Sequence, residues 1–193
     1  MSRIWIGTAI AVVAGLLAVG CSSPATPERA YYLLRGGNST AGLPPASGEQ
    51  RAGIRTVEVA PYLDRAGIVV GLGPNEVREA VFHLWAEPLR SGIRAHLEDR
   101  VSEQLGYVIG GSQAIARTWR KRVDIAIRQL HGLASGEVRL AGSFTVTSGG
   151  GDVLAVEQVN ATTRQSEPGY ASLVAAEIQL LDELGDQIAD SLR

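Results

Sequence analysis

Residues 123–146, VDIAIRQLHGLASGEVRLAGSFTV, contain two runs in which apolar and polar side chains alternate. The first run places Val123, Ile125 and Ile127 on one face of an extended chain, and residues 138–146 repeat the pattern. A period of two with one apolar face is typical of antiparallel strands that bury that face. These 24 residues therefore predict the centre of a sheet.

Shorter β-favouring runs on both sides predict further strands of this sheet. Residues 68–70 and 79–85 flank a Gly- and Pro-containing segment and predict a hairpin with an irregular turn. Three more strands are expected at residues 31–34, 54–59 and 153–159.

Two segments have the period of an amphipathic helix instead. Residues 88–105 carry Leu or another aliphatic side chain at every fourth position, and Gly106 is a natural stop. Residues 172–192 carry a continuous apolar stripe with steps of three and four. Strands followed by a helix, twice, predict a single-domain α/β sandwich in which two amphipathic helices cover one face of a mixed, mostly antiparallel sheet.

The N-terminal residues form a targeting signal. One positive charge at Arg3 precedes the uncharged, mostly apolar segment 4–19, which spans about 24 Å as a helix and is too short for a hydrocarbon core of about 30 Å. The segment ends at Cys21 in a string, LAVGC, that resembles a bacterial lipobox. We therefore expect a signal peptide over residues 1–20 and lipidation of Cys21. Ser22, in place of a retaining Asp, favours the outer membrane.

The mature chain has one predicted domain. Residues 21–30 are expected to form a lipid-anchored tether, residues 31–193 the folded domain, and the Gly-, Ser- and Pro-rich residues 36–53 a flexible loop within it. Because 18 basic residues face 20 acidic ones, no positive excess is available for nucleic acid. A single cysteine excludes an intramolecular disulfide and a Cys-based zinc cluster.

No string of residues carries recognisable catalytic or cofactor chemistry. His83, His96 and His131 stand in no metal-binding spacing, and we expect packed or surface imidazoles without a metal. The chain lacks the phosphate-binding and nucleophile motifs of ATPases and α/β-hydrolases, so neither a cofactor nor enzymatic activity is expected. The acidic pair Asp182-Glu183 is interpreted as part of a solvated helix face, without a histidine partner.

Four strings together resemble the ABC-type transport auxiliary lipoproteins, the family of paraquat-inducible protein C (PqiC). They are YYLL at residues 31–34, VEVAPYLDR at 57–65, IV at 68–69 and WAEPL at 85–89. The chain departs from the family pattern at Ala66-Gly67, where Pro-Gln is frequent, and at Val70-Gly71, near which the family has an Arg. A contact made by that Arg is not carried over to this chain.

The resemblance implies a transport role without catalysis. Such lipoproteins are anchored at the periplasmic face of the outer membrane and serve systems of an inner-membrane permease, an ATPase and a periplasm-spanning MCE-domain protein that conducts lipid. The resemblance further implies docking to the MCE protein and a possible homo-oligomeric ring.

The sequence leaves the docking surface and one alternative function open. Tyr31, Tyr32 and Trp85 are candidate interface residues, because a strand near the tether can pair at an exposed sheet edge, although core packing explains the same residues. The alternative function is a periplasmic lipoprotein that binds lipid or another solute itself, which requires an apolar pocket between the helices and the sheet. A lipid-processing enzyme is a third, disfavoured class.

Overall fold

The structure is a computed structural model that describes residues 27–35, 40–111 and 116–193. Its longer elements follow in the order β1 (Ala30–Tyr32), β2 (Ala52–Val59), β3 (Gly67–Gly73), β4 (Glu76–Trp85), α2 (Leu89–Leu105), β5 (Lys121–Leu133), β6 (Glu137–Ser148), β7 (Val153–Arg164) and α3 (Tyr170–Leu192). Two short 3₁₀ helices, η2 (Gly48–Gln50) and η3 (Ala116–Thr118), precede β2 and β5.

One seven-stranded sheet runs in the order β1-β4-β3-β5-β6-β7, and β2 pairs with β5 as well. The long pairings of β5 with β6 and of β6 with β7 are antiparallel, as the alternating runs predicted. Strands β2 and β3 both lie parallel to β5 but along different parts of it, β2 beside residues 121–127 and β3 beside residues 132–133. The predicted mixed sheet is confirmed, and β3 and β4 form the predicted hairpin.

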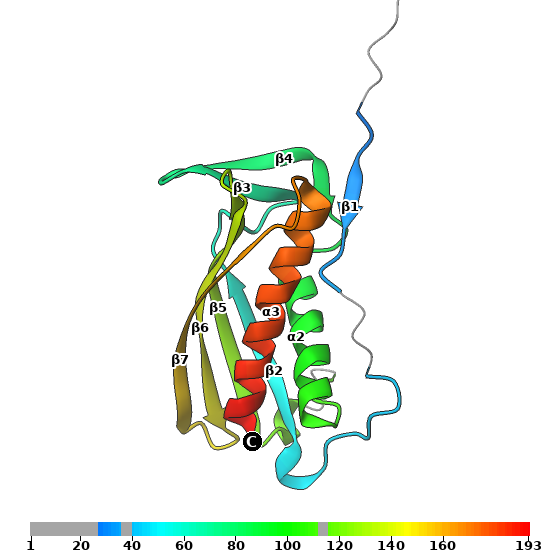
Figure 1. Cartoon of the computed structure of the whole chain (residues 1–193). Helices are drawn as coiled ribbons and strands as arrows, with labels where there is room; N and C mark the ends of the chain where they lie inside the picture. Colours follow the sequence, from blue (N-terminus) through cyan, green and yellow to red (C-terminus); the bar gives the residue numbers. More distant parts are fainter. Residues whose placement is uncertain (1–26, 36–39, 112–115) are drawn as a thin grey trace, which may run out of the picture.

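Both helices pack on the same face of the sheet, which confirms the predicted α/β sandwich (Figure 1). The side chains of Leu89, Ile93, Leu97 and Val101 in α2 are at most 3% exposed, and the helix ends at Gly106 with a positive φ of 75°. Helix α3 places its apolar stripe against β5, β6 and β7. The core lies between the helix pair and the sheet.

Polar contacts hold the two helices together and include one that the sequence interpretation missed. Arg100 donates from Nε and Nη2 to the carboxylate of Asp186, at 2.7 and 2.9 Å. His96, 1% exposed, places Nε2 3.0 Å from Oδ1 of Asp182. The interpretation that Asp182 has no histidine partner is therefore wrong, because α2 and α3 meet face to face and bring residues 86 positions apart together.

The predicted loop over residues 36–53 is only partly within the described residues, since residues 36–39 lie outside them. Strand β2 already begins at Ala52. Before it, the backbone N–H of Ala46 donates to the carbonyl of Val108 at 3.1 Å, and the N–H of Val108 donates to the carbonyl of Pro44 at 2.8 Å. Residues 44–46 thus lie against the chain that follows α2.

Candidate partner-docking surface

The chain enters the sheet at β1, next to the end of β4. β1 runs parallel to the last three residues of β4, with Tyr31 opposite Leu84 and Tyr32 opposite Trp85. The structure therefore brings the three predicted interface residues, Tyr31, Tyr32 and Trp85, to one place. β1 is the terminal strand of the sheet within the described residues, so its outer edge has no strand beside it there. That a partner binds this edge remains a prediction.

The two tyrosines of β1 have different environments. Tyr32 is half-buried, and its hydroxyl lies within hydrogen-bond distance, 2.9 Å, of Nδ1 of His83. The His83 ring in turn stacks on Tyr170, the first residue of α3, with ring centroids 3.9 Å apart. Tyr31 is 61% exposed. Tyr32 is therefore a structural residue that fixes β1, and Tyr31 is the side chain available to a partner.

Beside β1, two of the four strings that carry the family resemblance, those at residues 57–65 and 85–89, contribute to one depression of about 410 Å³. It is lined by Asp64, Arg65, Ala66 and the five residues from Trp85 to Leu89. Backbone bonds join these segments: the N–H of Trp85 donates to the carbonyl of Ala66, and the N–H of Ala86 donates to the carbonyl of Tyr32, each at 2.8 Å. Strand β1, which follows the predicted tether, and the strings 57–65 and 85–89 thus lie on one surface, which we call the docking surface.

Only some residues of the string 57–65 lie on this surface. Val57, Val59 and Leu63 belong to the core and are at most 8% exposed. Tyr62 donates its hydroxyl to the carbonyl of Arg128 at 3.1 Å, and burial raises its pKa. Asp64 and Arg65 are exposed. The apolar members of the string therefore build the fold, and two of its three charged members, Asp64 and Arg65, line the depression.

Four of the five charged side chains in and beside the depression form ion pairs, and Arg65 has none among the described residues. Arg35 forms a two-bond contact with Glu87, from Nε to Oε1 at 3.2 Å and from Nη2 to Oε2 at 2.8 Å. The hydrogen bond with Glu87 and the charge of that carboxylate raise the pKa of Arg35. Arg90, in the first turn of α2, pairs with Asp64. The surface consequently presents mixed, mostly paired charge around exposed apolar groups, which suits the recognition of another protein.

Within the described residues, no group of three or more histidine, cysteine or acidic side chains is placed to hold a metal ion. The predicted lipidation site Cys21 and the predicted signal peptide 1–20 lie outside the described residues. No helix in the described part of the chain is long and apolar enough to span a membrane.

Sequence reasoning missed the two ion pairs of this surface, Arg35–Glu87 and Asp64–Arg90. All four residues fall in or beside the quoted strings, but a sequence shows no sign of which opposite charges will meet across 26 or 52 positions. The sequence does show charged residues at the end of the string 57–65 and at the centre of the string 85–89, which could have indicated that these positions take part in ion pairs.

Comparison with known proteins places the chain among transport components. A family model described as ABC-type transport auxiliary lipoprotein component matches residues 32–189. A crystal structure of an uncharacterized protein aligns with a TM-score of 0.70 and 22% identity, over 86% of this chain and 100% of that one. A protein from Xanthomonas campestris aligns with a TM-score of 0.62 and 16% identity, over 82% of this chain and 92% of that one. A search of curated proteins finds no match.

Proposed function

Because this chain belongs to the ABC-type transport auxiliary lipoprotein component family, we propose that it is the non-catalytic docking component of an MCE-type lipid-transport system at the outer membrane. Family membership makes it an auxiliary lipoprotein of an ABC-type transport system. The PqiC-like role, the MCE-domain partner, the lipid cargo, a homo-oligomeric ring and the outer-membrane location are our proposals.

The observation that supports the docking role is that β1 lies on the same surface as the strings 57–65 and 85–89, which carry the family resemblance. The anchor at Cys21 precedes β1 by nine residues, which reach at most about 30 Å when fully extended. The membrane therefore holds the depression lined by Trp85–Leu89 within a short distance of itself. A partner that crosses the periplasm would meet this end of the domain as it approaches the outer membrane.

The edge of β1 supports a specific mode of docking. An unpaired strand edge can accept a strand from another chain, which gives affinity through backbone hydrogen bonds. Tyr31 adds a large aromatic side chain, a residue type that often dominates binding energy at interfaces. We propose that the MCE-domain partner pairs along β1 and covers Tyr31.

Co-purification with the MCE-domain protein of the same cell tests this function. We expect Tyr31→Glu to lower the amount of co-purified partner at least about tenfold, since it places a charge in the interface. Val156→Glu is the matched control, because Val156 is equally exposed at 60% and lies on β7 at the opposite edge of the sheet. We expect this variant to keep its partner. Failure of the unaltered lipoprotein to associate, or equal loss in both variants, would contradict the proposal.

The anchor requires its own experiment. We expect radiolabelled palmitate on the native chain and none on Cys21→Ser, which should leave the outer-membrane fraction. A Cys21→Ser variant that keeps its membrane fractionation would show that another feature holds the protein at the membrane.

A further inference from the structure

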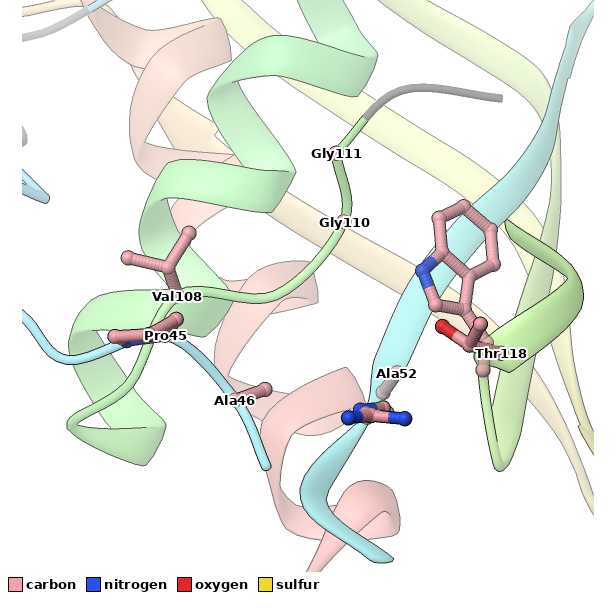
Figure 2. Close-up of a pocket in the computed structure, with 9 residues that line it drawn as sticks. Pro45, Ala46, Ala52, Val108, Gly110, Gly111 and Thr118 are labelled. Atoms are coloured by element: carbon pink, nitrogen blue, oxygen red, sulfur yellow. The ribbon is translucent and has the colours of Figure 1, made fainter. Parts of the chain in front are cut away.

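A second depression, of about 430 Å³, lies beyond the C-terminal end of α2 rather than between the helices and the sheet. Figure 2 shows Pro45 and Val108 on one side of it and Thr118 on the other. Small and apolar groups make up most of its lining, together with Arg51 and Trp119. The volume falls within the range of small-molecule sites, roughly 300–1,000 Å³.

Backbone hydrogen bonds hold the walls of this depression. One wall is fixed by the bonds between residues 44–46 and Val108, and a second by the N–H of Gly110, which donates to the carbonyl of Ala52 at 2.8 Å. Gly110 has a φ of 78°, and a Cβ there would come within 2.8 Å of the Glu98 carboxyl group. The depression is therefore formed by the fold itself, without a ligand.

Trp119 supplies a hydrogen-bond donor for which the described residues provide no acceptor. Its side chain lies against Gly53 of β2, where a Cβ would come within 2.4 Å of the indole ring. The residue is 4% exposed, and its Nε1 is buried without a hydrogen-bond partner among the described residues. Buried N–H groups are nearly always paired, so an unpaired one beside a preformed depression points to an oxygen atom of a ligand.

Positive charge surrounds the mouth of the depression. An adjoining hollow of about 340 Å³ shares Arg51, Thr118 and Trp119 with it and adds Arg117 and Arg120. All three arginines are exposed, and within the described residues the only carboxylate paired with them is Glu49, 3.5 Å from Arg120. On a chain with a net charge of −2, three guanidinium groups with one paired carboxylate among the described residues are a local excess of positive charge. Guanidinium groups bind carboxylate and phosphate oxygens through two parallel bonds.

We propose that this end of the domain binds an amphiphilic anion with a single alkyl chain. The alkyl chain occupies the apolar depression, and an oxygen atom of the ligand accepts a hydrogen bond from Nε1–H of Trp119. The carboxylate or phosphate head group pairs with Arg51, Arg117 and Arg120. A fatty acid and a lipid phosphate monoester share this chemistry. The site goes beyond the docking role and does not depend on it, because none of its residues lines the surface at Trp85.

The binding experiment uses the mature chain with Cys21→Ser, in aqueous buffer without detergent. All residues of the core cluster lie between Leu34 and Leu192, so this chain retains the whole core. Signal removal leaves Trp85 and Trp119 as its tryptophans. A Trp85→Phe background then reports on Trp119 alone, and a Trp119→Phe background on Trp85 alone.

Decyl phosphate below its critical micelle concentration is the probe. We expect saturable binding at one site per chain, with a change in the fluorescence of Trp119 and none in that of Trp85. Decyltrimethylammonium, decyl maltoside and inorganic phosphate should each bind at least about tenfold more weakly. Comparison of decyl phosphate with decanoate then tells which head group the site prefers.

Three variants assign the binding to this site. Arg51→Gln should weaken decyl phosphate binding at least about tenfold, and Ala46→Leu should abolish it by filling the depression while Trp119 stays in place. Arg65→Gln, an exposed arginine at the other end of α2, should leave the affinity unchanged. Equal binding of the cationic probe, equal binding of inorganic phosphate, or full affinity in Ala46→Leu would each overturn the proposal. These outcomes are independent of co-purification with the MCE-domain protein.

Discussion

The two ends of α2 carry depressions of nearly the same volume but of opposite chemistry. The helix has 17 residues, about 25 Å, and separates a depression of 410 Å³ at Trp85–Leu89 from one of 430 Å³ at Val108–Gly111. At the first end, both carboxylates that line the depression, Asp64 and Glu87, are paired with arginines. At the second end, an indole N–H has no acceptor in the part of the chain that the structure describes, and there the three exposed arginines have one paired carboxylate.

The difference separates two kinds of recognition. A surface whose carboxylates already have arginine partners needs no ligand to complete them, and it offers shape and exposed apolar groups to a folded partner. A preformed hollow with an unpaired donor is completed by a molecule that brings the missing oxygen and negative charge. Under the two proposals, one small domain is a docking module at one end and a ligand site at the other.

The largest expected effects come from removing one buried aliphatic side chain at each end. Leu34, 2% exposed, packs beside Gly92 at the start of α2, and Ile109, 3% exposed, follows the end of α2. We expect Leu34→Ala and Ile109→Ala each to lower the free energy of unfolding by about 2–5 kcal/mol, because each leaves a cavity. Chemical denaturation followed by circular dichroism measures both.

This pair also tests whether β1 is part of the cooperative core. If Leu34→Ala costs less than about 1 kcal/mol while Ile109→Ala costs the full amount, the β1 segment detaches on its own, and the docking surface is not preformed. Leu34→Met, which keeps most of the volume, is the control and should cost less than about 1.5 kcal/mol.

Much of the fold could be predicted because its longer elements have strong periods. Leu89, Ile93, Leu97 and Val101 recur every four residues and fix the buried face of α2. The alternation in β5 and β6 fixes which side chains face the helices, since a shift by one residue would expose all of them. The order of the strands was not predicted. Strands β2 and β3 both pair with β5, and the chain between Val59 and Gly67 sets this arrangement. That connecting segment has no hydrophobic period from which the pairing could be predicted.

The two depressions differ in how far the sequence predicted them. Tyr31, Tyr32 and Trp85 belong to recognisable strings and were named as interface candidates; the structure brings them together, and binding of a partner there stays a prediction. Trp119 was not named as a candidate, because its neighbours form no pattern and its environment is made by Gly53, 66 positions away. A missing hydrogen-bond acceptor is a property of the folded chain and has no signature in a sequence.

A smaller effect is expected from Glu98, whose carboxyl group lies beside Gly110 near the second depression. Burial raises the pKa of Glu98 to about 7, and the charge of Arg94 only partly opposes this. Arg94 itself donates to the carbonyls of Ile54 and Arg55 at 2.8 and 2.7 Å. In the unfolded chain the carboxyl group returns to an ordinary pKa near 4.5.

The sign of the pH effect follows from these two values. The folded protein retains the Glu98 proton up to about pH 7, so the contribution of this group to stability is complete below pH 4.5 and is lost as the pH rises through 7. We expect Glu98→Gln to be more stable than the native chain at pH 8, with the difference shrinking toward pH 4.5. Urea denaturation at a series of pH values measures it.

Asp124 provides a control of opposite sign for that series. Burial alone would raise its pKa, but hydrogen bonds from Arg55 and Thr56 outweigh burial and lower it. Asp124→Asn should therefore be less stable than the native chain at pH 7, with the loss disappearing as the pH falls below the ordinary aspartate range. A Glu98→Gln difference that does not change with pH would show that the carboxyl group is solvated in the folded protein.

The smallest expected effect is at the first end, in the ion pair between Asp64 and Arg90. Their side chains are 36% and 52% exposed, and exposed pairs of this kind contribute about 0.2–1 kcal/mol. A double-mutant cycle with Asp64→Asn and Arg90→Gln should give a coupling energy in that range, falling as salt is added. The Arg100–Asp186 pair, whose arginine is only 22% exposed, is the comparison and should keep more of its coupling in salt.

The size of that coupling decides how the charged end of the string 57–65 is understood. A small value means that Asp64 and Arg90 contribute little to folding, so their place on the docking surface rests on recognition of a partner. The same Asp64→Asn variant should then lower co-purification with the MCE-domain protein while leaving the melting temperature nearly unchanged. A coupling energy well above 1 kcal/mol would instead show that the ion pair stabilises the packing of the loop between β2 and β3 against α2. Asp64 would then no longer support the docking role.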